Sequence, residues 1–287
     1  MSNDNGGKQK ELGHTRCGGT TFQWGKRTYI MGIINLSVDS FAGDGLGDVE
    51  VAIDRAKRMA AEGADIIDVG GESTRPGSAP ISVDEELSRV IPVLEGLANE
   101  ISVPLSIDTY KLEVARQALN AGVNMINDVW GLKKEPKLAE LAAQQEVPII
   151  LMSNQRDISS HHDIIFPDII SVVTSDLRRA IQQAMVSGVP RENIIIDPGI
   201  GFGKTQEQNL EIMRRLEELK ALTRPILIGT SRKSVIGRVL DLPSEQRLEG
   251  TAATVAIGVA KGADIVRVHD VREVARVCRM SDAIIRS

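Results

Sequence analysis

Residues 62–74, EGADIIDVGGEST, decide the fold, because a helix-like end and a glycine lead into a short apolar run that finishes in polar residues. The same form recurs as AGVNMINDVWG at 121–131, SGVPRENIIIDPG at 187–199 and KGADIVRVHD at 261–270. Glycine is common just past a helix end, where left-handed backbone angles are needed. The apolar run is too short for a helix and too uniform for a half-solvated strand, so it predicts a buried parallel strand.

Further apolar runs complete a series of strands, and helix-like stretches such as VEVAIDRAKRMAAEG at 49–63 and EQNLEIMRRLEELKAL at 207–222 separate them. This alternation predicts an α/β protein with a (β/α)8 TIM barrel; the alternative is an open, doubly wound sheet. The expected strands are Tyr29–Asn35, Asp65–Gly70, Leu105–Asp108, Met125–Asp128, Ile149–Met152, Ile194–Asp197, Ile226–Gly229 and Ile265–His269.

The residues before Tyr29 do not follow the repeat. We expect a flexible tail over 1–12, and one barrel domain over 13–287. Within that domain, CGGTTFQWGKRT at 17–28 is expected to form a short strand or hairpin over the N-terminal end of the barrel. The polar N-terminus lacks the apolar core of a signal peptide, and no apolar stretch is long enough to span a membrane, so we expect a cytoplasmic protein.

Composition excludes several classes of function. The net charge of -5 argues against a general nucleic-acid binder, which needs a basic face. The two cysteines, Cys17 and Cys278, form neither a disulfide framework nor a metal-ligand pattern. With only 3% aromatic residues, the core must consist of Ile, Val, Leu and Ala.

Polar residues gather where the predicted strands end, which is the end of a TIM barrel that carries the chemistry. Asp108, Asn127 and Asp197 are expected to point into one cavity, where carboxylate and amide groups match the edge of a flat heterocycle. Lys233 can donate to the ring from above. Arg75, Arg267 and His269 supply positive charge at one rim, which favours a phosphate or pyrophosphate.

Each residue taken alone has a structural alternative. Asp108 and Asn127 are common helix N-caps, Asp197 before Pro198 is a common turn residue, and an isolated lysine or arginine is usually a solvated charge. Their shared position on different strands favours a site. GIGFGKT at 199–205 lacks the spacing of a phosphate-binding P-loop, so its glycines indicate a tight turn and a close approach to a ligand.

At these residues the chain resembles the dihydropteroate synthase family from about Cys17 to Ile285. The matching stretches are IMGIINLSVDSFAGDG at 30–45, GADIIDVGGESTRPG at 63–77, PLSIDT at 104–109, MINDVWG at 125–131, IIIDPGIGFGKT at 194–205, ILIGTSRKSVIG at 226–237 and GTAATVAIGVAKGADIVRVHDV at 250–271.

The resemblance implies an enzyme that joins 6-hydroxymethyl-7,8-dihydropterin pyrophosphate to 4-aminobenzoate, giving 7,8-dihydropteroate and pyrophosphate. It implies small-molecule substrates, a Mg²⁺ ion beside Asn35, a homodimer, and catalytic roles for Lys233, Asp197, Arg267 and His269. The implied pterin site is Asp108, Asn127, Met152, Asp197, Phe202 and Lys233. The implied pyrophosphate site is Asn35, Arg75, Arg267 and His269, and the implied 4-aminobenzoate site is Phe41, Thr74, Arg75, Pro76 and Ser231.

Two stretches depart from the family pattern. Ser37 and Val38 stand where the family commonly has Thr and Pro, and LMSNQRD at 151–157 lacks the usual His after Met152. The second departure, at Ser153 and Asn154, leaves open a pterin-binding paralogue without synthase activity. A second rival is a methyltetrahydrofolate:corrinoid methyltransferase, which shares the pterin-binding barrel. The retained STRPG, TSRK and RVH stretches argue against the methyltransferase, which needs no pyrophosphate site.

Overall fold

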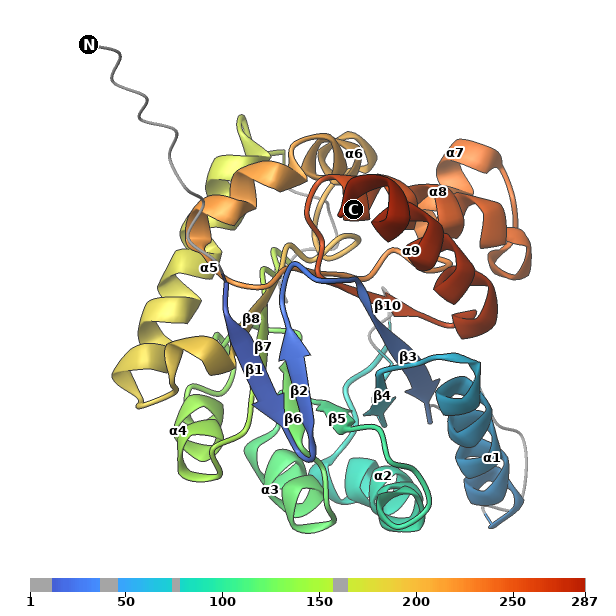
Figure 1. Ribbon diagram of the computed structural model, residues 1–287. Helices are drawn as coiled ribbons and strands as arrows, with labels where there is room; N and C mark the ends of the chain where they lie inside the picture. The colour runs from blue at the N-terminus through green and yellow to red at the C-terminus, as the bar shows by residue number, and fades with distance from the viewer. Residues whose placement is uncertain (1–11, 37–45, 74–77, 157–164, 287) are drawn as a thin grey trace.

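Eight parallel strands form a barrel with helices outside it in the computed structural model, which describes residues 12–36, 46–73, 78–156 and 165–286 (Figure 1). The strand order is β8-β7-β6-β5-β4-β3-β10-β9, and a parallel bridge between Ile196 and Ile226 links the two edge strands. The predicted barrel is therefore confirmed and the open sheet is excluded. The barrel strands are β3 (Tyr29–Asn35), β4 (Ile66–Gly70), β5 (Leu105–Asp108), β6 (Met125–Asp128), β7 (Ile149–Met152), β8 (Ile194–Asp197), β9 (Leu227–Ile228) and β10 (Ile265–Val268).

The predicted strand bounds agree with the structure for five strands and differ slightly for three. Asp65 precedes β4, β9 is limited to two residues, and His269 follows β10. The glycines before the predicted strands do end helices with left-handed angles: φ is 109° at Gly63 and 98° at Gly262. A strand therefore begins soon after each of these turns.

Some of the helices that cover the barrel begin with a side-chain cap, and one of these caps is reciprocal. Thr205 and Gln208 form a reciprocal capping box at the start of α6. The helices are α1 (Leu46–Glu62), α2 (Val83–Ala98), α3 (Leu112–Asn120), α4 (Lys137–Gln144), α5 (Ile169–Val186), α6 (Gln206–Arg214), α7 (Ser234–Leu240), α8 (Leu248–Ala260) and α9 (Val271–Ile285), with short 3-10 turns η2 (Arg191–Asn193), η3 (Leu216–Leu222) and η4 (Ser244–Gln246).

The helix expected over 207–222 is divided into α6 and η3. Leu216, Leu219 and Leu222 are all buried and lie three residues apart. Side chains at that spacing align along a 3-10 helix, whereas they drift around an α-helix. Tertiary burial of the leucines therefore favours the tighter turn.

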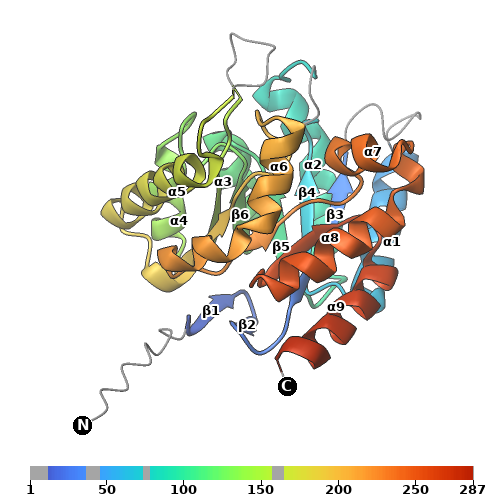
Figure 2. The same cartoon turned by 90° about the horizontal axis from the view of Figure 1, so that it is seen from above.

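The N-terminal hairpin closes the barrel, as the sequence predicts (Figure 2). Its strands are β1 (His14–Cys17) and β2 (Thr20–Gln23), so it begins three residues earlier than expected. Phe22 and Trp24 pack with Tyr29 against a layer of inward-facing apolar side chains from the barrel strands. Leu12, assigned to the tail, packs partly buried against this cluster, and the rest of the expected tail lies outside the described residues.

The barrel interior changes from apolar to polar along its strands. Alternate residues of a strand share one face. Ile66 and Met125 belong to the apolar layer beside the hairpin, and two residues further on stand Asp68 and Asn127, both buried. This alternation places buried polar side chains at the C-terminal end, called the barrel mouth below.

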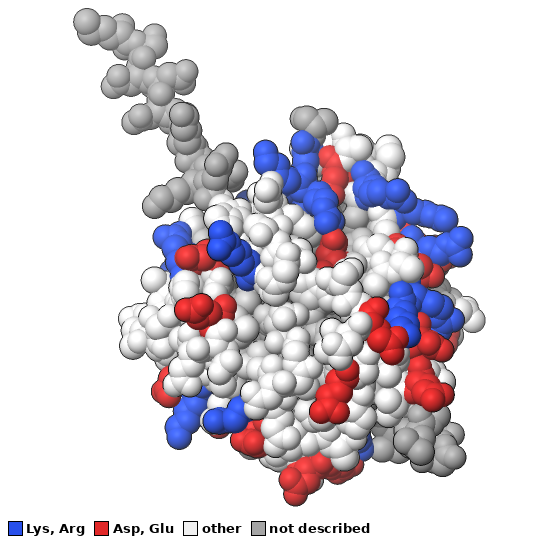
Figure 3. All heavy atoms as spheres, turned by 60° about the horizontal axis from the view of Figure 1, so that its bottom comes forward, with Lys and Arg blue, Asp and Glu red and all other residues white. Residues whose placement is uncertain are grey.

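The remaining surface shows no basic concentration on the face in Figure 3, where Lys and Arg are interspersed with Asp and Glu around a wide uncharged area. A cavity of about 790 Å³ lies at the N-terminal end, where residues of the hairpin and Asp264 line it. Within the described part of the chain, no helix is long and apolar enough to cross a membrane.

Candidate active site

Side chains from four strands meet in the barrel mouth. The guanidinium of Arg267 on β10 donates from Nε to Asp68 on β4 and from Nη2 to Asp108 on β5, both at 2.6 Å. Asn127 on β6 donates from Nδ2 to Asp68 at 3.0 Å. The structure therefore brings Asp108 and Asn127 together, as the sequence predicts. Arg267, expected at the rim, is bonded within the same cluster.

The centre of this cluster is Asp68, a residue that the sequence analysis missed. Its side chain is fully buried, and Oδ1 has no hydrogen-bond partner among the described residues. Strand register contained the signal: Asp68 follows Ile66 by two residues, as Asn127 follows Met125 and Arg267 follows Ile265. The predicted site residues were sought at strand ends, whereas Asp68 lies in the middle of β4.

The cluster has more carboxylate charge than its guanidinium can neutralise. Burial raises the pKa of Asp108 to about 7; the Arg267 charge opposes this shift and the Asp68 charge adds to it. Burial also disfavours the Arg267 charge, but the ion pairs with Asp68 and Asp108 outweigh this and raise its pKa. The deep part of the mouth therefore favours a ligand that donates hydrogen bonds.

Asp197 and Lys233 lie on the other side of the mouth. Asp197 Oδ1 accepts from the backbone N–H of Gly199 at 2.7 Å, so it is a turn residue as well as a buried carboxylate. Lys233 Nζ donates to the Ile200 carbonyl at 2.6 Å and lies 4.5 Å from the centre of the Phe202 ring. Burial lowers the pKa of Lys233 to about 8, although Asp197 opposes this shift.

An apolar wall completes the pocket on this side. Met152 and Phe202 pack with Val129, and Trp130 lies against them. The aliphatic and aromatic side chains suit one face of a flat ring. Val129 and Trp130 were not identified from the sequence, because they follow the polar residues of β6.

The helix-cap alternatives do not hold. Lys111 is the N-cap residue of α3, and Asp108 is bonded to Arg267. Asp128, the neighbour of Asn127, accepts from the backbone N–H groups of Trp130 and Leu132 at 2.8 and 2.6 Å. Asp108 and Asn127 are therefore available to the pocket.

The expectation that His269 adds positive charge to the rim is wrong for the free protein. Burial, with the nearby Arg232, Arg267 and Arg55 charges, lowers the pKa of His269 to about 3. The imidazole is therefore neutral near pH 7. Its Nδ1 lies 3.0 Å from Ser231 Oγ, so Ser231, assigned by resemblance to the 4-aminobenzoate site, is in contact with the pyrophosphate residue His269.

Asn35 ends β3 in the same mouth, paired in register with Gly70. In the described ranges no group of three or more His, Cys, Asp and Glu side chains is placed to hold a metal ion. Mg²⁺ needs few protein ligands when substrate phosphates and water supply the rest. A single amide oxygen at Asn35 fits that kind of site. Phe41, Thr74, Arg75 and Pro76, with Ser37 and Val38, lie outside the described residues.

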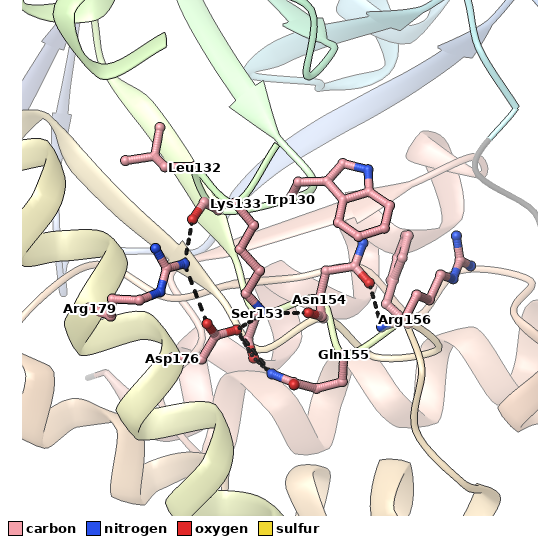
Figure 4. A network of polar contacts seen from close by, with 12 residues as sticks. Trp130, Leu132, Lys133, Ser153, Asn154, Gln155, Arg156, Asp176 and Arg179 are labelled. Carbon is pink, nitrogen blue, oxygen red and sulfur yellow. Dashed lines mark hydrogen bonds and ion pairs between the residues drawn. The ribbon is translucent and has the colours of Figure 1, made fainter. Parts of the chain in front are cut away.

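The unusual stretch after Met152 forms an ordered network (Figure 4). Residues 153–156 are called the β7 loop, and residues 198–205 are called the β8 loop. Ser153 and Asn154 are buried. Asp176 of α5 accepts from Ser153 Oγ at 3.0 Å and from Gln155 Nε2 at 2.9 Å, and Lys133 pairs with it at 2.7 Å. Although these residues depart from the family pattern, Ser153 and Asn154 are buried, and hydrogen bonds to Asp176 hold the β7 loop against α5.

Comparison with known proteins agrees with this geometry. The family model described as pterin binding enzyme matches residues 31–269. The dihydropteroate synthase of Clostridium beijerinckii is 50% identical over 273 residues, which are 94% of this chain and 99% of the relative. Among solved structures, the dihydropteroate synthase of Clostridium difficile in the presence of pteroic acid has a TM-score of 0.88 at 51% identity, covering 93% of this chain and 100% of its own. The dihydropteroate synthase of Xanthomonas albilineans with 4-aminobenzoic acid has a TM-score of 0.88 at 38% identity. The match covers 94% of this chain and 97% of that one.

A barrel whose polar mouth faces an apolar wall, together with the match over residues 31–269, defines a pterin-binding enzyme. Within that class, the chain belongs to the dihydropteroate synthase family, whose members are transferases of folate biosynthesis.

Proposed function

We propose that this chain condenses 6-hydroxymethyl-7,8-dihydropterin pyrophosphate with 4-aminobenzoate in the barrel mouth. The observation that carries the proposal is the bonded cluster of Asp68, Asp108, Asn127 and Arg267, which faces Asp197 and Lys233. A pterin has an edge of N–H donors and ring acceptors, which buried carboxylates, an amide and an ammonium can match. The similarity to proteins named dihydropteroate synthase also supports the proposal.

The pterin lies with one face against Met152 and Phe202, and its polar edge meets Asp197, Asn127 and Lys233. Lys233 donates to the ring carbonyl or a ring nitrogen. Asp108 and Asp68 hold Arg267 in place by two short hydrogen bonds. Such preorganised groups require little rearrangement when the charge on the substrate changes.

The pyrophosphate lies at the rim beside Arg267, His269 and Asn35. Nε and Nη2 of Arg267 are used by carboxylates, and within the described residues Nη1 is left for an anion. Neutral His269 serves as a hydrogen-bond donor to the pyrophosphate. Mg²⁺ held by Asn35 and the phosphate oxygens would neutralise charge on the leaving group.

In the reaction, the bond from the exocyclic methylene carbon to the pyrophosphate oxygen breaks first, and the oxygen keeps the electron pair. The positive charge on carbon is shared with the pterin ring. The amino nitrogen of 4-aminobenzoate then bonds to that carbon and gives a proton to water. Phe41, Thr74, Arg75 and Pro76 are proposed to hold 4-aminobenzoate, with Ser231 at the border of the two sites.

The test is an assay of pyrophosphate release with the pterin ester and Mg²⁺, with and without 4-aminobenzoate. We expect release that depends on both 4-aminobenzoate and the metal, with dihydropteroate formed in equal amount. Pterin binding in a calorimetric titration without turnover would instead indicate the non-catalytic paralogue. Methyl transfer from methyltetrahydrofolate to a corrinoid would indicate the methyltransferase.

We further propose that the protein is a homodimer formed through α7, α8 and α9. This region exposes large apolar side chains, which on a monomer are usually scattered. Light scattering coupled to size exclusion should give twice the 31.1 kDa chain mass. Ile257→Asp should shift the mass to one chain. The exposed large apolar residues described in these helices are Val239, Leu240, Ile257, Met280, Ile284 and Ile285.

We propose a cytoplasmic location, supported by the state of the cysteines. Cys17 and Cys278 are both buried as free thiols, and burial raises the pKa of each to about 12. Neither has thiolate character near pH 7, so neither is a reactive group. Fractionation of cells expressing the protein tests the location.

A further inference from the structure

Lys204 is a buried lysine that the reaction proposed above does not use. Only 3% of its surface is exposed. Its Nζ donates to the carbonyl oxygens of Ser153 at 2.8 Å, Gly199 at 2.9 Å and Phe202 at 3.2 Å. An ammonium group has three N–H donors, and here each has one backbone acceptor. Burial lowers the pKa of Lys204 to about 7, so keeping the ammonium in this place has an energetic cost.

The three carbonyls belong to two different loops. Ser153 begins the β7 loop, whereas Gly199 and Phe202 belong to the β8 loop. The two loops also bond directly, because Gln155 N–H donates to the Phe202 carbonyl at 3.2 Å. Just before the β8 loop, the carbonyl of Asp197 accepts from Ser153 N–H at 2.9 Å. Lys204 therefore joins two backbones that already lie side by side.

Glycine makes this close approach possible. Gly199 and Gly203 have φ of 71° and 67°, angles that other residues rarely adopt. A Cβ atom at Gly199 would overlap the Ser153 carbonyl oxygen that Lys204 binds, and one at Gly203 would overlap the backbone of Gln155. The carbonyl oxygens of the β7 and β8 loops consequently face one buried point, which the ammonium fills.

The β8 loop contains Phe202 and contacts two other groups that are proposed to hold the pterin. Asp197 accepts from Gly199 N–H, Lys233 donates to the Ile200 carbonyl, and the Phe202 ring lies under Lys233. The β7 loop is itself fixed to α5 through Asp176. A displacement of the β8 loop would therefore disturb the Asp197 carboxylate, the Ile200 carbonyl that binds Lys233 and the Phe202 ring together.

We propose that Lys204 is a positioning residue for the pterin ester, because its ammonium clamps the β7 and β8 loops and so fixes Asp197, Phe202 and Lys233. The inference rests on the function proposed above. Its effect is confined to the pterin half of the site, since the residues proposed for 4-aminobenzoate follow β3, β4 and β9 in the sequence and none follows β7 or β8. Loss of the clamp should therefore change the KM of the two substrates unequally.

The test is Lys204→Met, which keeps the length of the side chain and removes all three donors. We expect the KM for the pterin ester to rise roughly tenfold or more, because the bonds that join the two loops through the ammonium are lost. The Ser153 carbonyl then loses its partner, and the Gly199 and Phe202 carbonyls each keep one backbone N–H donor. We expect the KM for 4-aminobenzoate to change less than about twofold. Calorimetric titration with 6-hydroxymethyl-7,8-dihydropterin should show a matching loss of affinity.

Lys133→Met is the matched control. Lys133 donates to the Asn154 carbonyl of the β7 loop at 2.5 Å and pairs with Asp176, but none of its described partners is in the β8 loop. Its pterin KM should stay within about threefold of the wild type. An equal rise of the pterin KM in Lys204→Met and Lys133→Met would overturn the assignment of a pterin-specific clamp to Lys204. Equal rises of the KM for both substrates in Lys204→Met would overturn it as well.

Lys204→Arg covers the case in which Lys204→Met does not fold. It keeps the charge, but a planar guanidinium cannot meet three carbonyls arranged around a tetrahedral ammonium. We expect a folded protein with a raised pterin KM, and a wild-type pterin KM would reject the proposal. A wild-type protein that releases no pyrophosphate would instead reject the proposed function, so the two failures are distinguishable.

Discussion

Asp68 on β4 and Arg267 on β10 form a buried ion pair of 2.6 Å, although 199 residues separate them in the chain. The two strands flank β3, so its parallel pairing with both of them brings the pair together. Asp68 also accepts from Asn127, and Arg267 also donates to Asp108. The pair therefore connects the residues proposed for the pterin with the residue proposed for pyrophosphate.

Asp68→Asn should reduce kcat/KM about 10- to 100-fold, because a hydrogen bond to a charged group is replaced by a neutral one and Arg267 keeps only one carboxylate. Steady-state kinetics with both substrates measures the loss. Glu85→Gln is the control, since Glu85 pairs with Arg89 on the surface of α2 and should leave kcat/KM unchanged. Wild-type kinetics in Asp68→Asn would show that Asp68 has no part in the site.

Lys233→Ala should lower kcat/KM by roughly 100-fold or more through loss of the donor to the pterin. The fold should remain, because burial opposes the charge of Lys233 and its removal relieves that cost. Kinetics and thermal unfolding are measured on the same preparation. A large fall in Tm would assign Lys233 a structural role.

Asp197→Ala should also reduce kcat/KM by roughly 100-fold, since Asp197 is the buried carboxylate whose charge acts most strongly on Lys233. A loss of stability is expected as well, because the Gly199 N–H loses its acceptor. Asp197→Asn retains an acceptor and separates the two effects: restored stability with persistent inactivity is the expected outcome. Recovery of both would mean that the negative charge is not needed.

His269 should make the protein less stable as pH falls. Its pKa is about 3 in the folded protein and about 6.5 in an unfolded chain. Between these values the unfolded state binds a proton that the folded state does not, so the free energy of unfolding decreases by up to about 1.4 kcal/mol per pH unit. His269→Gln lacks this contribution, so its stability relative to the wild type should rise by about 2 kcal/mol between pH 7 and pH 5. Urea unfolding at both pH values measures the difference, and a constant difference would contradict the lowered pKa.

Phe22→Ala should destabilise the fold without changing the chemistry. Phe22 is fully buried in the hairpin cluster, where its ring centre lies 4.9 Å from that of Tyr29. Removal of a buried aromatic ring costs about 3–5 kcal/mol. The KM values at 25 °C should stay within about twofold, because the hairpin is at the opposite end of the barrel. Gln23→Ala, an exposed change on the same strand, should leave both properties unchanged.

The barrel and much of its mouth could be predicted from the sequence, because a buried parallel strand has a local composition that can be recognised. Five strands have the expected bounds, namely β3, β5, β6, β7 and β8. The turns at Gly63 and Gly262 follow from local backbone sterics. The placement of Asp108, Asn127 and Asp197 follows in turn from the fold, since parallel strands of a barrel present their C-terminal ends together.

Tertiary structure alone decided which partners these residues have and what charge they carry. The contacts of Arg267 with Asp68 and of Lys204 with Ser153 join segments far apart in the chain, so no local sequence pattern predicts them. The neutral state of His269 likewise comes from burial among arginines of other elements. Composition and periodicity act through neighbours in sequence, whereas desolvation and ion pairing depend on what the closed barrel places around each side chain.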